Sequence, residues 1–404
     1  MLKVPTSTEH YRLARRARAF EADPWGAEVP GGQHPDPIYF GNGAPAAEIQ
    51  PLDRLQRAAE RAWIEVGGKL GYGEREGWLP LRELIAERMV LRGVNVEPDD
   101  LFVTNGSQQG IDLLARMFLD PGDSIIVEAP TYIGAMQVFD AYEATYISCP
   151  VDEFGLCTDA LAEILRTTNP VPKLLYTIPT FQNPTGHSMT LERRRELLEL
   201  TEAYGVIVVE DDPYGEIYFS SEAPAPALRS LSDRVVYLGS FSKTIAPALR
   251  VGWTIAPADL IPLLIIAKEG ADIHSNRIET RIVYHTATDF LDDHVGRIRG
   301  YYRDRRDLLF DSLTTHMPEQ ITFRRPQGGF FVWCDLPPGT SAEELLEFAA
   351  SFGVAFLPGS WFYPGYAGPV EGMRLSYSSL PIERIPEGAK RLAAATEAFL
   401  SGKR

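Results

Sequence analysis

The stretch that decides the fold lies at residues 235–243 and reads Val-Val-Tyr-Leu-Gly-Ser-Phe-Ser-Lys. Its first five residues are β-branched, aromatic or small, which is the pattern of a buried strand. Lys243 follows this strand, where burial of an ammonium without a partner would be costly. A lysine that forms a Schiff base needs such a partly desolvated place. For a single lysine, a solvated loop position is the commoner explanation. Other residues of the chain are needed to distinguish it from a Schiff-base lysine.

Two hydroxyl groups and an arginine accompany this lysine. Ser240 and Ser242 lie just before it, and Arg250 follows seven positions later, at the start of the apolar run 251–255. Hydroxyl donors and a guanidinium are groups that bind phosphate. The neighbourhood of Lys243 therefore suits a ligand that carries a phosphate.

The composition argues against several classes of protein. With 404 residues, 45% of them hydrophobic, the chain is long enough for two lobes and a large core. Its net charge of −16 argues against a nucleic-acid partner, which requires clustered lysine and arginine. The three cysteines show no metal-type spacing, and no apolar run reaches the length of a membrane span. We expect a cytoplasmic protein without a metal, membrane or nucleic-acid partner.

Strands and helices alternate between residues 101 and 255, which predicts an α/β fold. The strands are apolar throughout, as expected when both faces of a parallel sheet are covered. We therefore expect a three-layer sandwich with a mostly parallel central sheet, followed by a smaller α+β domain. Strands are predicted at residues 101–104, 124–128, 144–148, 174–178, 206–209, 235–239 and 251–255. Helices are predicted at residues 52–66, 108–119, 133–142, 159–166, 191–204, 292–313 and 382–400.

The predicted division of the chain has three parts. An N-terminal arm that joins the small domain covers residues 1–45, the large domain covers 46–295 and the small domain covers 296–404. The long charged helix at residues 292–313 is expected to lead from one domain into the other.

Polar residues follow several of the strands, at the edge where an open parallel sheet binds ligands. Ser107 lies in the turn after the first strand, where free N–H groups at a helix start form an anion site. Asn183 follows another strand and can offer an amide N–H. Glu210, Asp211 and Asp212 end a third strand, and three adjacent carboxylates predict a nearby cation. Separately, each feature also has an ordinary structural explanation as a cap or turn.

Together these strand ends supply the groups that one cofactor needs. They offer an amine for an aldehyde, a phosphate site, a carboxylate for a protonated ring nitrogen and donors for a phenolate. Pyridoxal 5′-phosphate (PLP) requires this set.

The sequence resembles the fold-type I PLP enzymes of the class I/II aminotransferase family. The resemblance begins near residue 39, and it is strongest to α-aminoadipate and kynurenine aminotransferases and to the effector domains of MocR-type regulators. The motifs that carry it lie, in order, at residues 182–186, 210–216, 239–243, 249–253, 326–333 and 373–377.

The resemblance implies a role for each matching residue. Lys243 would bind PLP and move the Cα proton, and Asp211 would pair with the ring nitrogen. Asn183 and Tyr214 would bond the phenolic oxygen, with Asn183 also near the substrate. Tyr132 would stack on the ring and belong to the catalytic set. The phosphate would be held by Ser107, Gln108, Ser240, Ser242 and Arg250.

Two further matches concern the substrate and the partner subunit. Arg374 matches the arginine that grips the α-carboxylate of the substrate, which lysine does poorly. Tyr72 matches a tyrosine that reaches the phosphate of the neighbouring subunit. The resemblance thus implies a homodimer with shared sites.

The stretch at residues 40–48 departs from the family pattern, because Asn42 brings a polar amide to the place where relatives have a Gly-Gly-x-Pro turn. We expect Asn42 to contact the substrate, so this departure points to an unusual substrate or reaction. The leading hypothesis is amino transfer between an L-amino acid and a 2-oxo acid. The alternative is a PLP-dependent lyase or synthase that eliminates, replaces, decarboxylates or forms a carbon–carbon bond. A PLP-sensing regulator is disfavoured by the net charge and the short N-terminal segment.

Overall fold

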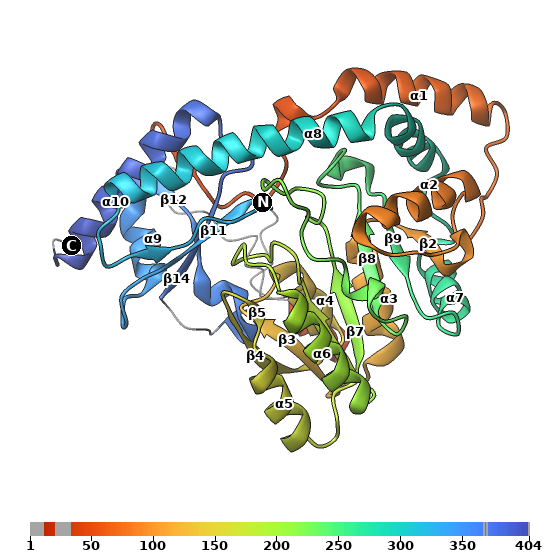
Figure 1. Cartoon of the computed structure of the whole chain (residues 1–404), viewed down its shortest axis with the longest axis horizontal. Coiled ribbons are helices and arrows are strands. Elements are labelled where there is room, and N and C mark those ends of the chain that lie inside the picture. The colour runs from red at the N-terminus through yellow and green to blue at the C-terminus, as the bar shows by residue number, and fades with distance from the viewer. Residues whose placement is uncertain (1–11, 21–33, 367, 369–370, 403–404) are drawn as a thin grey trace.

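The computed structural model describes residues 12–20, 34–366, 368 and 371–402. Its larger part is built on an eight-stranded sheet in the order β2-β9-β8-β7-β6-β3-β4-β5 (Figure 1). The neighbours from β8 to β4 are parallel, whereas β9 runs antiparallel to β2 and β8. The strand bounds are β2 Leu101–Thr104, β3 Ser124–Ala129, β4 Thr145–Asp152, β5 Gly155–Leu156, β6 Leu174–Thr177, β7 Ile207–Asp211, β8 Val236–Ser240 and β9 Gly252–Ile255.

Helices cover both faces of this sheet, as the apolar strands predicted. Helices α3, α4 and α7 pack with Leu238 on one face, whereas α2 and the first half of α8 pack with Tyr237 on the other. Helices α5 and α6 extend the second face over β3 and β7. The expected three-layer α/β sandwich is confirmed. The helix bounds are α1 Leu52–Val66, α2 Leu79–Met89, α3 Ser107–Phe118, α4 Ile133–Ala141, α5 Thr158–Thr167, α6 Leu191–Ala203, α7 Ile261–Asp272 and α8 Arg277–His316.

Helix α8 is much longer than the predicted segment 292–313. It begins at Arg277, where the side chain of Asn276 caps the backbone N–H groups of Ile278 and Glu279. Its first half contributes Val283 to the core of the large domain, and its second half contributes buried residues to the small domain (Figure 1). The boundary predicted between residues 295 and 296 therefore falls inside one continuous helix, and the division there stays a prediction.

Helix α7 was not predicted, because Pro262 interrupts its apolar sequence. In the structure Pro262 lies in the first turn. Proline is tolerated there, since its missing N–H would have no partner within the helix.

The smaller part contains an antiparallel sheet in the order β10-β11-β14-β13, covered by α9, α10 and the second half of α8. A separate parallel pair joins β1 to β12, with Ile38 opposite Val354 and Tyr39 opposite Ala355. The bounds are β1 Ile38–Tyr39, β10 Thr322–Phe323, β11 Phe331–Asp335, β12 Val354–Ala355, β13 Leu357–Pro358, β14 Gly372–Ser376, α9 Ala342–Ala349 and α10 Ile385–Leu400.

Much of the predicted N-terminal arm lies outside the described residues, which include 12–20 and 34–45 of it. Its last residues run along the small domain, because the N–H of Ser376 donates to the carbonyl of Phe40 at 2.6 Å. None of the helices in the described residues is long and apolar enough to cross a membrane.

Candidate active site

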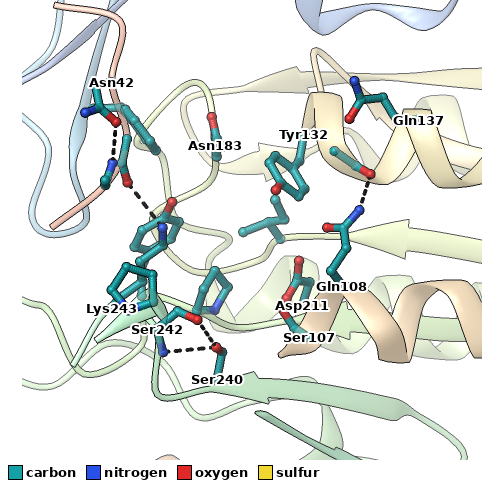
Figure 2. A pocket seen from close by; sticks show the side chains of 18 of the residues that line it. Asn42, Ser107, Gln108, Tyr132, Gln137, Asn183, Asp211, Ser240, Ser242 and Lys243 are labelled. Carbon is teal, nitrogen blue, oxygen red and sulfur yellow. Dashed lines mark hydrogen bonds between the residues drawn. The ribbon is translucent and has the colours of Figure 1, made fainter. Parts of the chain in front are cut away.

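A cavity of about 430 Å³ opens at the carboxyl ends of β6, β7 and β8 (Figure 2). Residues from both sheets line it. The predicted site residues found there are Asn42, Ser107, Gln108, Tyr132, Asn183, Asp211, Tyr214, Ser240, Ser242, Lys243, Arg250 and Arg374. The remaining lining residues are Gly43, Ala44, Gly134, Gln137, Ile178, Pro213, Pro247 and Phe331.

Lys243 reaches into this cavity from the turn after β8. Its Nζ donates a hydrogen bond to the carbonyl oxygen of Gly43 at 3.2 Å. Burial lowers the pKa of Lys243 to about 8, helped by Arg374 and Arg250 and opposed by Asp211. A neutral amine, which is the form that attacks a carbonyl carbon, is therefore well populated near pH 8.

The three carboxylates at the end of β7 are separated by the alternation of the strand. Glu210 lies 3.7 Å from the guanidinium of Arg194, and Asp212 accepts a hydrogen bond from Nε of Arg92 at 2.8 Å. The cations predicted by the acidic cluster are therefore these two buried arginines. Asp211 faces the cavity instead.

Asp211 has one oxygen in use and one without a partner. Its Oδ2 accepts a hydrogen bond from the hydroxyl of Tyr176 at 2.8 Å. Its Oδ1 is buried and has no partner at hydrogen-bond geometry among the described residues, although the nearby hydroxyl of Ser107 acts to lower the pKa of this carboxyl. Burial raises the pKa of Asp211 to about 7. A protonated ring nitrogen would supply the N–H that Oδ1 needs, so this carboxylate fits PLP.

The residues predicted to bind the phosphate lie close together at the start of α3. The N–H of Ser242 donates to Oγ of Ser240 at 3.0 Å, and the two hydroxyls lie 2.8 Å apart. Arg250 donates to the carbonyl oxygen of Asn105 at 3.2 Å. A Cβ at Gly106, whose φ is +74°, would lie 2.4 Å from this guanidinium, so glycine is required for the close approach. A helix start, two hydroxyls and a guanidinium together fit a phosphate.

Tyr132 precedes α4, and its ring lies against Gly134. A Cβ on Gly134 would lie 2.5 Å from the ring, so this glycine makes room for it. The side-chain amide of Gln108 donates to the carbonyl oxygen of Gly134 at 2.6 Å, which ties α3 to the start of α4. Figure 2 shows Tyr132 and Gln108 on the same side of the cavity as Asp211.

Arg374 is a buried cation, only 1% exposed. It donates to Oδ1 of Asn183 at 2.8 Å and to the carbonyl oxygen of Gly41 at 2.5 Å, and its Nε has no hydrogen-bond partner among the described residues. The guanidinium carbon lies 4.2 Å from the ring centre of Phe331. Burial lowers the pKa of Arg374 to about 10. Because its protein acceptors are neutral, this guanidinium is suited to an anion such as a carboxylate.

Asn183 and Tyr214 also face the cavity. Since Asn183 accepts from Arg374 through Oδ1, its Nδ2 amide group can serve another acceptor. Tyr214 is buried, and burial raises the pKa of its phenol, so it stays a neutral donor. Both residues suit the predicted bonds to a phenolic oxygen.

Asn42 and Tyr72 are both exposed in this chain, but they lie in different places. Asn42 lines the cavity, with Oδ1 accepting from the N–H of Ala44 at 3.0 Å. Tyr72 does not line it. Its side chain is 80% exposed and contacts the ring of His274 edge-on.

Among the residues of the site that were not predicted from the sequence, three contribute a ring or a polar side chain, namely Tyr176, Gln137 and Phe331. Tyr176 is a polar residue in a largely apolar strand, and Gln137 is a polar residue in the largely apolar α4. Phe331 lies on β11 of the small domain, and its place at the cavity depends on how the two domains pack together. The first two carried a weak signal, namely a polar group in an apolar element.

Two relatives and one solved structure resemble this chain over most of its length. The 2-aminoadipate transaminase of Thermus thermophilus is 38% identical over 91% of this chain and 92% of the relative. The aromatic-amino-acid aminotransferase 1 of Thermococcus litoralis is 39% identical over 89% of this chain and 87% of the relative. The crystal structure of α-aminoadipate aminotransferase from Thermus thermophilus, complexed with N-(5′-phosphopyridoxyl)-L-leucine, is 36% identical, covers 96% of this chain and 98% of that one, and superimposes with a TM-score of 0.88.

The family model for aminotransferase class I and II matches residues 36–392. The match spans both sheets and every residue that lines the cavity. The chain therefore belongs to the class I and II aminotransferase family, and it is a PLP-dependent enzyme of fold type I that transfers an amino group between an amino acid and a 2-oxo acid.

Proposed function

We propose that Lys243, Asp211 and Arg374 perform this amino transfer in the roles that the resemblance implies, and that the favoured donors are aromatic L-amino acids. The observation that carries the proposal is the convergence of a buried amine, an unpartnered carboxylate oxygen and an anion-binding guanidinium in one cavity. When bound, PLP supplies an aldehyde for the substrate amine and a ring that accepts the electron pair released at Cα.

The side chains then divide the work among them. Arg374 binds the α-carboxylate of the substrate and so fixes the orientation of Cα. Lys243, with a pKa of about 8, removes the proton from Cα of the substrate and then donates a proton to the cofactor. Asp211 holds the positive charge of the ring nitrogen, and Asn183 and Tyr214 bond the phenolic oxygen.

The cavity favours a donor without a second carboxylate. Among the described residues that line it, the cations are Lys243, Arg250 and Arg374, and each already has a proposed partner. What remains for the substrate side chain is the ring of Phe331 and the amides of Asn42 and Gln137. The relatives include both an aromatic aminotransferase and a 2-aminoadipate transaminase, and the ring of Phe331 together with the two uncharged amides supports the aromatic choice.

A donor screen tests this choice. L-Phenylalanine, L-tyrosine and L-2-aminoadipate are each incubated with 2-oxoglutarate, and kcat/KM is measured from the oxo-acid product. We expect the aromatic donors to exceed 2-aminoadipate by about tenfold or more. An equal or larger kcat/KM for 2-aminoadipate would refute the choice. Incubation without 2-oxoglutarate tests for the lyase and synthase reactions.

We further propose a cytoplasmic homodimer in which Tyr72 acts on the partner subunit. The exposure of Tyr72, away from the cavity of its own chain, supports this assignment. An exposed aromatic ring contributes no stabilisation through burial. At a subunit interface the ring of Tyr72 can be buried and its hydroxyl can form a hydrogen bond.

A further inference from the structure

A second, much smaller cavity adjoins the residues that are predicted to bind the phosphate. Its volume is about 20 Å³, and Ser240 and Pro213 line both this cavity and the active-site cavity. The residues that line it are Arg88, Met89, Arg92, Asp212, Pro213, Gly215, Glu216, Tyr237, Ser240, Thr244 and Trp253.

Three buried polar atoms on this lining lack a hydrogen-bond partner among the described residues. They are Oδ1 of Asp212, Oγ1 of Thr244 and Nε1 of Trp253. The three residues are at most 6% exposed. A buried polar atom without a hydrogen-bond partner is destabilising, so three such atoms on residues around one cavity indicate a bound partner.

The chemistry of the three atoms identifies that partner. Trp253 can only donate through Nε1, so the ligand must accept a hydrogen bond. The carboxylate oxygen of Asp212 can only accept when ionised, so the ligand must also donate. A metal ion or an ammonium ion cannot accept, and an anion would oppose Asp212. Water does both, and a cavity of this size is large enough for one molecule.

We propose that one water molecule is bound here as a fixed part of the structure, bonded to Asp212, Thr244 and Trp253. Two of these residues are sequence neighbours of active-site residues. Asp212 follows Asp211, and Thr244 follows Lys243. The water thus links the end of β7 to the turn after β8 and to β9. We assign Thr244 as a positioning residue for the turn that carries Lys243.

A neighbouring cavity of about 340 Å³ adjoins the small one. It shares with the small cavity the lining residues Arg88, Arg92, Gly215 and Glu216.

A crystal structure of the PLP-loaded enzyme at about 1.5 Å tests the site. We expect one solvent peak at about 2.7–3.2 Å from each of the three atoms. An empty cavity would overturn the proposal, and so would an ion with metal-type coordination or a repacking that pairs the three atoms with protein groups.

Two matched variants test its role. Thr244→Val removes the buried, unpartnered hydroxyl of a residue that lines the cavity, whereas Thr254→Val removes a buried, unpartnered hydroxyl of a residue that does not line it. We expect Thr244→Val to weaken or abolish the solvent peak and to speed PLP dissociation about three- to tenfold. We expect Thr254→Val to leave the peak and the dissociation rate unchanged.

Unchanged PLP dissociation in Thr244→Val would refute the positioning role, as would an equal acceleration in both variants. Should Thr244→Val fail to fold, Trp253→Phe removes the donor from the same water. It is expected to give the same loss of density, and retention of the full peak in that variant would count against the proposal.

Discussion

Burial and two nearby cations, Arg374 and Arg250, lower the pKa of the Lys243 amine and so favour its neutral, nucleophilic form. Since its pKa is lowered to about 8, the neutral fraction rises about tenfold between pH 7 and pH 9 and then levels off. The rate at which the apoenzyme captures PLP should follow the same curve, measured by absorbance from pH 6 to pH 10.5. Arg374→Met should move the midpoint upward, because one cation is lost. A rate that still climbs steeply above pH 10 would contradict this assignment.

In its proposed role, Arg374 would bind the substrate carboxylate through the planar donors of its guanidinium. Arg374→Lys keeps the charge but loses that geometry, so kcat/KM for the amino donor should fall by about 10- to 100-fold, mainly through KM. Steady-state kinetics measure both parameters. Arg384→Lys is the matched control, because Arg384 forms a surface ion pair with Asp36. A loss confined to kcat would show that Arg374 does not bind the substrate in its ground state.

At the scale of single elements, the end of β7 depends on paired charges beneath the cavity. Arg92→Met would leave Asp212 buried without its cation, at a cost of about 3–5 kcal/mol in the free energy of unfolding. Urea denaturation measures this change. Arg166→Ala breaks an exposed pair with Glu163 and should leave the same quantity nearly unchanged. Similar losses in the two variants would mean that the buried pair contributes no more than a surface pair.

The start of α4 is shaped by one glycine. Gly134→Ala would push Tyr132 out of its place, since the new Cβ would lie 2.5 Å from the ring. We expect the Kd for PLP to rise about tenfold, measured by titration of the apoenzyme. Gly296→Ala on α8 is the control, because a Cβ there meets no atom within 4 Å. If the Kd is unchanged in Gly134→Ala, Tyr132 does not contribute to PLP binding.

Elements with a strong local pattern were predictable, and those that depend on context were not. The apolar strands around Lys243 and the helix Leu52–Val66 lie where the sequence placed them. The first half of α8 was missed because its buried face includes Thr280, Arg281 and Thr286, which packing with other parts of the chain makes tolerable. A two-residue strand such as β1 carries no periodic signal, since its pairing with β12 defines it.

On the scale of the whole molecule, the proposed dimer makes a test by complementation possible. Lys243→Ala and Tyr72→Phe subunits should each have low activity. In a mixed dimer, the site with an intact Lys243 would receive an intact Tyr72 from its partner. Equal mixing with free exchange should then restore about one quarter of the parental activity, with light scattering reporting the dimer. A monomeric mass, or no recovery in mixtures shown to contain mixed dimers, would contradict the shared site.

The candidate site was more predictable than its surroundings. Lys243 and Asp211 follow buried strands, where a charged residue is unexpected without a function. The contacts of Arg374 were not predictable from spacing, because Asn183 lies 191 positions away and meets it only after the two parts of the chain fold together. Gln137 was missed for a different reason, because a single glutamine on a helix has many ordinary explanations.

The pairing of β1 with β12 makes one short piece of chain a mechanical link. The small domain holds this piece at Ile38 and Tyr39, and Arg374 on β14 holds it at Gly41. Two residues later, the carbonyl of Gly43 receives the hydrogen bond of Lys243. Any rotation of the small domain against the large sheet would pull on all three points together. Engagement of the substrate carboxylate and release of the lysine amine would then be a single movement transmitted along the chain.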